Sequence, residues 1–75
     1  MDRFSQLEAF VATATLGSFS AAARDEGVTP ALIARRLDAL EARLGVRLFV
    51  RSTRKLALTA EGHTLLEQAP AILQG

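Results

Sequence analysis

Apolar residues recur every three or four positions along most of the chain, which is the spacing of helices that bury one face. A first helix is expected over residues 6–16, with Ser5 and Glu8 forming a capping box at its start. Gly17 is expected to end this helix, because glycine adopts the left-handed backbone conformation without strain. The apolar positions of the helix are Phe4, Leu7, Phe10, Val11 and Ala14.

Two further helices are expected on either side of Gly27, and each begins after a hydroxyl-bearing residue. Ser18 is placed to accept a hydrogen bond from a free backbone N–H of a short second helix. Thr29 is placed to do the same for a third helix over 30–44, and Pro30 occupies the first helical position, which proline favours. The core stripe of the third helix is Ile33, Leu37, Leu40 and Leu44.

The pattern changes after the third helix to two short apolar runs, residues 46–50 and 56–58, which predict a β-hairpin with a polar tip. Thr59 is then expected to cap a final helix. The chain is therefore predicted to be mainly α, with two parts. Residues 1–58 form a winged helix-turn-helix of three helices with a small β-hairpin wing, and residues 59–75 begin a C-terminal linker helix.

Composition narrows the class of protein. The chain has 75 residues, of which 49% are hydrophobic, so it is one small domain with enough apolar groups for a core. No apolar run approaches the roughly 20 residues of a membrane helix, and the N-terminus lacks a secretory pattern, so we expect a soluble cytoplasmic protein. There is no cysteine, His63 is the only histidine, and no phosphate-binding glycine loop or metal-spaced cluster occurs. These absences argue against an enzyme, a metal site or a bound cofactor.

Basic residues are concentrated in one part of the chain. The net charge is only +1, but residues 29–55 hold seven basic residues against two acidic ones, a net charge of +5. Such a segment, on a helix-turn-helix with a wing, is typical of a nucleic-acid surface. Taken alone, a charge cluster or one arginine among alanines is more often an ordinary solvated face, so the combination carries the interpretation.

The start of the third helix and the hairpin tip are the expected contacts with double-stranded DNA. Small side chains let the helix backbone approach base edges in the major groove, where the planar fork of Arg35 can bind a guanine. On the wing, Arg51, Arg54 and Lys55 are expected at or near the tip, where burial is improbable and they can contact phosphates or enter the minor groove. The groove-facing residues of the helix are expected to be Thr29, Pro30, Ala31, Ala34 and Arg35.

Several short motifs stand at a spacing that one protein family shares. They are Leu7 with Phe10, Gly17-Ser18-Phe19, Ala22-Ala23, Gly27-Val28-Thr29, Leu40-Glu41, Leu44-Gly45, Leu48-Phe49 with Arg51, and Leu58-Thr59 with Gly62. Over nearly its whole length the chain thus resembles the N-terminal domain of LysR-type transcriptional regulators. The resemblance implies sequence-specific DNA binding, with recognition helix 30–44 in the major groove and the wing over 51–55 at the backbone or minor groove, where Arg54 occupies the position that reaches the minor groove.

The resemblance also implies a homodimer formed through the C-terminal helix, and a tetramer in the full-length protein. A small effector would bind only to a C-terminal domain that these residues do not include. Apolar residues of the final helix would be exposed on a lone domain, which favours a dimer interface over an ordinary core stripe. The expected interface residues are Leu65, Leu66, Ala69, Ile72 and Leu73.

Four positions depart from the family pattern, and one of them is Glu26, which stands where a leucine is usual before the turn glycine. Family members commonly carry glutamine where Pro30 stands and serine where Ala34 stands, so base readout is expected to depend more heavily on Arg35. Asp38 lies where neutral or basic residues are frequent. We hypothesise that Asp38 lowers non-specific affinity for DNA, which binding by the Asp38→Asn variant tests.

A second function is compatible with the sequence. Winged helices also serve as protein-docking surfaces, so the alternative is a helical protein-interaction module built on the same scaffold. Salt dependence separates the two functions, because cations that neutralise DNA phosphates release counterions.

Overall fold

In the computed structural model, the described part of the chain, residues 3–51 and 56–74, folds into four helices and a two-stranded antiparallel hairpin. Side chains are described as far as Ala69. The predicted fold class, a winged helix-turn-helix followed by a C-terminal helix, is confirmed. The elements are α1 (Arg3–Leu16), α2 (Phe19–Glu26), α3 (Pro30–Leu44), β1 (Phe49–Arg51), β2 (Leu56–Leu58) and α4 (Ala60–Gln74).

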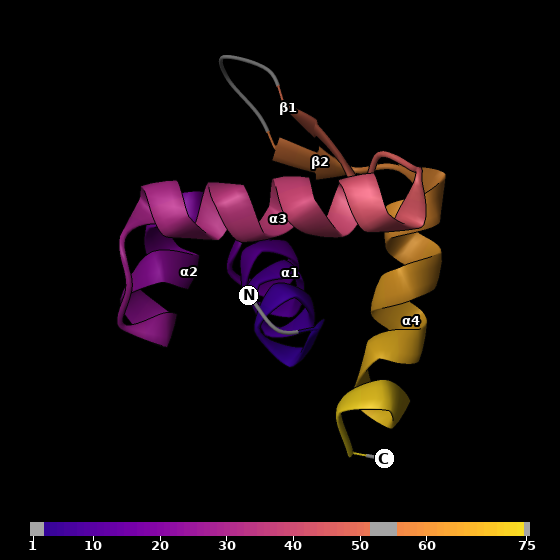
Figure 1. Ribbon diagram of the computed structural model, residues 1–75, viewed down its shortest axis with the longest axis horizontal. Helices are drawn as coiled ribbons and strands as arrows, with labels where there is room; N and C mark the ends of the chain where they lie inside the picture. The colour runs from indigo at the N-terminus through magenta and orange to yellow at the C-terminus, as the bar shows by residue number, and fades with distance from the viewer. Residues whose placement is uncertain (1–2, 52–55, 75) are drawn as a thin grey trace.

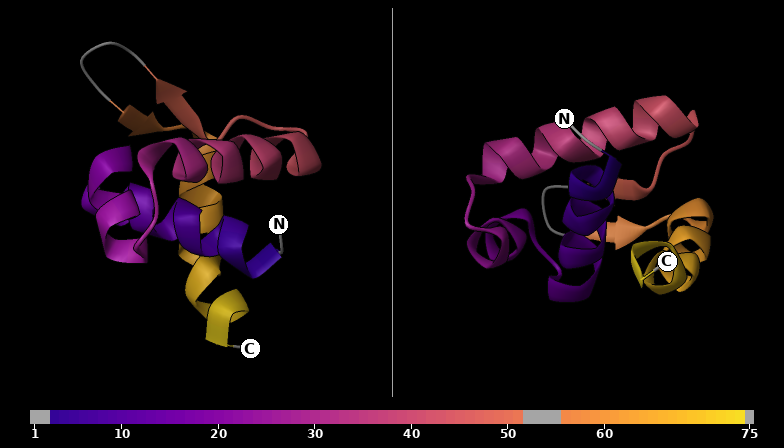
Figure 2. Two further views of the ribbon diagram at one scale, coloured as in Figure 1. Left: turned by 60° about the vertical axis from the view of Figure 1, so that its left-hand side comes forward. Right: turned by 60° about the horizontal axis from the view of Figure 1, so that its bottom comes forward.

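The wing and the far end of α4 lie on opposite sides of the molecule. Figure 1 shows α3 lying across α1 and α2, with the hairpin projecting on one side of α3 and α4 running away on the other. The left view of Figure 2 shows the same separation after a turn of the molecule. A surface formed by α3 and the wing is therefore separate from the C-terminal end of α4.

The core lies where the first three helices meet, and the wing is attached to it. Phe10, Ile33 and Leu37 are fully buried. Phe49, the first residue of β1, packs its ring against that of Phe10, with 5.4 Å between centroids and a tilt of 54°. The hairpin pairs Phe49 with Leu58 and continues outward from there. The inner end of the hairpin is thus part of the core.

Helices α2 and α3 begin at the caps that the sequence predicts. The Ser18 hydroxyl accepts the Ala21 N–H at 3.1 Å, and the Thr29 hydroxyl accepts the Leu32 N–H at 3.1 Å. Gly27, between the two helices, has a φ of 70°, which places it in the left-handed region. Each hydroxyl cap stabilises its helix by about 1 kcal/mol. These local contacts fix the turn that sets α3 against α2.

The capping box predicted for the first helix is wrong. Helix α1 begins at Arg3, so Ser5 lies inside its first turn and not at the extended residue that precedes it. Neither Arg3 nor Phe4 has a backbone that breaks a helix, and the helix therefore extends further toward the N-terminus than residue 6.

The first strand is shorter than predicted, beginning at Phe49 and not at residue 46. The Leu48 N–H donates to Glu41 Oε2 at 2.7 Å, and the Leu48 carbonyl accepts the Thr59 N–H at 3.0 Å. Both backbone groups of Leu48 are therefore bonded to α3 and to the residue before α4. The apolar run continues the pattern of a strand, but its first residues serve as a connector.

Helix α4 begins at the predicted cap and packs along α1. The Thr59 hydroxyl accepts the Gly62 N–H at 3.0 Å. Ala69 is fully buried within the single chain, so the expectation that it would be exposed on a lone domain is wrong. Leu65 and Leu66 are partly buried and pack against the core. The side chains of Ile72 and Leu73 lie outside the described residues.

Candidate nucleic-acid interface

The beginning of α3 presents an open surface of small side chains and one arginine. Thr29, Pro30, Ala31 and Arg35 are exposed, and Ala34 is half-buried; we call these five residues the α3 face. On the opposite side of the helix, Ile33 and Leu37 are fully buried in the core. No part of the described chain covers Arg35, which meets the requirement for a helix that approaches base edges.

The start of the α3 face is shaped by the Thr29 cap. Because its oxygen accepts the Leu32 N–H, Thr29 is held against the first turn, with the hydroxyl proton left for a further acceptor. Pro30 at the first helical position leaves no unpaired N–H of its own. The remaining free N–H groups give this end a partial positive charge, which favours phosphate binding.

Arg51, expected at the hairpin tip, is held against the helix-turn-helix. Its Nη2 atom lies 3.0 Å from Asp38 Oδ1 and 3.6 Å from Glu41 Oε1, both on α3. Its guanidinium carbon lies 5.1 Å from the centroid of the Phe19 ring at the start of α2. Its side chain is 30% exposed and the residue as a whole is exposed, so Arg51 is not buried, as expected, but its partners cover part of the guanidinium. Arg54 and Lys55, the other predicted wing contacts, lie outside the described residues.

Sequence reasoning missed the partners of Arg51. Asp38 was noted as a departure from the family pattern that is expected to lower non-specific affinity, and Phe19 as part of the Gly17-Ser18-Phe19 motif, but neither was linked to Arg51. These partners are far from Arg51 in the sequence, and no periodicity relates them. The motif in which Arg51 follows Leu48-Phe49 was the one available signal that its position matters.

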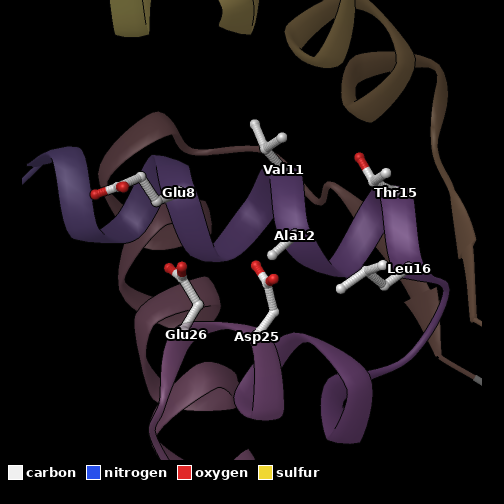
Figure 3. Close-up of a pocket in the computed structure, with 7 residues that line it drawn as sticks. All are labelled: Glu8, Val11, Ala12, Thr15, Leu16, Asp25 and Glu26. Atoms are coloured by element: carbon white, nitrogen blue, oxygen red, sulfur yellow. The ribbon is translucent and has the colours of Figure 1, made fainter.

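Acidic residues gather on a different surface, in a groove between α1 and α2. Figure 3 shows Glu8 on α1 across from Asp25 and Glu26 on α2, with Ala12 on the floor between them. Carboxylates repel DNA phosphates, so this groove is the wrong surface for a duplex.

Residues 3–51 and 56–74 contain neither a candidate metal site nor a membrane-spanning helix. No group of histidine, cysteine and acidic residues in these ranges is placed to hold a metal ion. None of the helices described there combines the length and the apolar character needed to cross a membrane.

Helix α2, the Gly27 turn and α3 form a helix-turn-helix, and the β1–β2 hairpin is the wing beside it, so the chain is a winged helix-turn-helix protein. Residues 4–63 match the family described as "Bacterial regulatory helix-turn-helix protein, lysR family". The chain belongs to this family, as its motifs predict.

Curated relatives are transcriptional regulators. The chain is 48% identical over 71 residues to the HTH-type transcriptional regulator TcbR of Pseudomonas sp. (strain P51), covering 95% of this chain and 24% of that protein. It is 41% identical over 68 residues to the probable HTH-type transcriptional regulator LtrA of Klebsiella pneumoniae, covering 91% of this chain and 22% of that protein. The chain therefore spans about a quarter of the length of these relatives.

Solved structures of the same fold include complexes with DNA. The chain superposes on the CbnR DBD in its DNA complex with a TM-score of 0.91 and 47% identity, covering 99% of this chain and 84% of that one. For full-length CbnR with its target DNA, the TM-score is 0.90 at 47% identity, and the match covers 99% of this chain and 25% of that one. For the BenM DBD with its catB site 1 DNA, the TM-score is 0.90 at 31% identity, and the match covers 99% of this chain and 81% of that one.

Proposed function

We propose that this chain is the sequence-specific DNA-binding part of a LysR-type transcriptional regulator, acting in the cytoplasm and catalysing no reaction. The observation that carries the proposal is the open α3 face, with Arg35 exposed among small residues at a capped helix N-terminus. The CbnR DBD, 47% identical to this chain, was solved as a complex with DNA. Residues 1–58 are proposed to dock on the duplex, and residues 59–75 to begin the linker helix.

In the proposed complex, the first turns of α3 enter the major groove. Pro30, Ala31 and Ala34 offer little bulk, so the backbone can lie close to the base edges. Arg35 then binds a guanine through its planar fork, which contributes about 1–3 kcal/mol of discrimination against the wrong base. The residues on the wing, Arg54 and Lys55, are proposed to contact the sugar-phosphate backbone or the minor groove.

A homodimer through α4 is part of the proposal. Leu65 lines an apolar groove together with Phe4 and Leu44, whose exposed fractions are 59% and 44%. A second copy that covers this groove would remove a continuous apolar surface from water. Leu65, Leu66, Ile72 and Leu73 stay in the proposed interface, whereas buried Ala69 is left out. The tetramer and the effector site remain predictions for the whole protein.

The test is binding to duplexes selected by the domain from a random library, compared with scrambled duplexes by fluorescence anisotropy. We expect the selected duplex to bind roughly 10³-fold more tightly or better. If a dimer neutralises about eight phosphates, log affinity should fall against log salt with a slope near −7. A library without enrichment, and binding that is insensitive to salt, would instead favour the protein-interaction module.

A further inference from the structure

Asp38 and Arg51 form an ion pair across the gap between α3 and the wing. Arg51 Nη2 donates to Asp38 Oδ1 at 3.0 Å, and the Asp38 side chain is 63% exposed. Asp38 follows Arg35 by three positions, so the two side chains lie on neighbouring parts of the same helix surface. A negative charge thus stands at the edge of the surface proposed to bind DNA.

The other groups around Arg51 do not replace Asp38 as its hydrogen-bond acceptor. Glu41 Oε1 lies 3.6 Å from Arg51 Nη2, which is beyond a hydrogen bond. The other carboxylate oxygen of Glu41 accepts the N–H groups of Leu48 and Phe49, which fixes Glu41 in place. Phe19 offers only the face of its ring. Asp38 is therefore the carboxylate that hydrogen-bonds Arg51 and keeps it turned toward α3.

We propose that Asp38 retains Arg51 on the protein and so withholds a cation from DNA phosphates, which makes Asp38 a specificity-determining residue. The inference rests on the proposed DNA-binding function. A cation that reaches a phosphate strengthens binding to every sequence, because it releases a counterion whatever the bases are. An arginine already paired with a carboxylate adds no net charge, and binding then depends more on contacts with bases.

The exposure of the Asp38–Arg51 ion pair sets how much the loss of Asp38 should change the affinity for DNA. An ion pair with one exposed partner changes an equilibrium by up to about fivefold. Loss of Asp38 should therefore raise the affinity for a scrambled duplex by about three- to fivefold. One further phosphate contact per protomer, which makes two per dimer, should also steepen the salt dependence of the dimer by about 1.8 in log affinity against log salt.

The experiment is a double-mutant cycle with Asp38→Asn, Arg51→Gln and the double variant, each binding a scrambled duplex. We expect Asp38→Asn to bind more tightly and with a steeper salt dependence in the Arg51 background, and to have no effect in the Arg51→Gln background. The matched control is Asp25→Asn, which removes the same charge from the exposed end of α2 that lines the acidic groove (Figure 3). Its affinity should be unchanged at 0.15 M salt, where charges beyond about 8 Å are screened.

Each outcome bears on the proposal. Equal gains in both backgrounds would show that Asp38 acts by repelling phosphates directly, and would overturn the role of Arg51. Unchanged affinity of Asp38→Asn, while the wild type binds its selected duplex, overturns this inference and leaves the proposed function standing. Failure of the wild type to bind any duplex would overturn both.

A measurement without DNA provides a second readout. The side-chain Nε–Hε resonance of Arg51 in the free domain should report restricted motion in the wild type and in Asp25→Asn. Asp38→Asn should make this group more mobile, and an equally rigid Arg51 in that variant would contradict the inference. Circular dichroism of each variant confirms that the domain is folded.

Discussion

Glu41 Oε2 lies 2.7 Å from the backbone nitrogen of Leu48 and 3.3 Å from that of Phe49, so one side chain of α3 binds the chain where it enters the wing. Glu41 is 8% exposed, and its two hydrogen bonds are formed away from water. The position of the wing is consequently tied to the recognition helix. A change at this contact should affect both the stability of the domain and the placement of the wing.

Replacing Glu41 by alanine should lower the free energy of unfolding by about 2–4 kcal/mol, because buried N–H groups lose their acceptor and nearby guanidiniums lose a counter-charge. Urea unfolding followed by circular dichroism measures the loss. Glu41→Gln keeps one acceptor oxygen, so its free energy of unfolding should lie between those of the wild type and Glu41→Ala. Glu67→Ala, at an exposed position of α4, is the matched control and should change stability little. A loss no larger than that of the control would contradict the role assigned to Glu41.

Gly62 should not tolerate alanine, although it lies in a helix. A Cβ there would collide with the Leu48 carbonyl oxygen and come within 2.9 Å of Leu58 Cδ2. Alanine normally stabilises a helix by up to about 1 kcal/mol relative to glycine. Here overpacking should dominate and cost about 1–3 kcal/mol. The melting temperature should fall by about 4–8 °C for each kcal/mol lost, and a higher melting temperature would refute the close approach of α4 to the wing.

Arg35→Ala should weaken binding to the selected duplex by about 1–3 kcal/mol and relax the preference at one base pair. Arg35→Lys is the matched control, because it keeps the charge but lacks the planar fork. The lysine variant should bind scrambled duplexes like the wild type while losing affinity for the selected one. Equal losses on both duplexes for Arg35→Ala would assign Arg35 to a phosphate contact.

If the protein binds as a dimer with two-fold symmetry, the selected DNA should contain two half-sites related by the same symmetry. The two α3 helices would enter major grooves on one side of the duplex, so inverted half-sites are expected about 34–36 Å apart or at a multiple of that distance. Hydroxyl-radical footprinting on a selected sequence measures the spacing. Protection of one asymmetric site would argue against this geometry.

Local contacts explain why much of the fold was predictable. The Ser18 and Thr29 hydroxyls each bind a backbone N–H three residues ahead, so the residue types alone predict these caps. Gly27 takes the positive φ expected of a glycine that ends a helix. The stripe through Ile33 and Leu37 also shows which side of α3 is buried, and thus which side is open.

The features that the sequence did not predict depend on contacts between distant parts of the chain. The guanidinium of Arg43 donates to Gln6 Oε1 at 2.9 Å through Nη2, a contact that joins α3 to α1 and allows a polar side chain to be buried. Arg51 is paired with Asp38 in the same way, whereas by sequence it is only a cation beside a polar loop. Burial of Ala69 depends on how α4 packs along α1, which helical spacing does not specify.

If the α3 face is the surface that contacts base pairs, its amide resonances should shift most when the domain is titrated with a selected duplex and followed by NMR. We expect the largest amide shifts at Thr29, Ala31 and Arg35, with small shifts at Glu8 and Asp25 in the acidic groove. Shifts concentrated at Glu8 and Asp25, with the amides of the α3 face unchanged, would show that DNA does not bind at the α3 face.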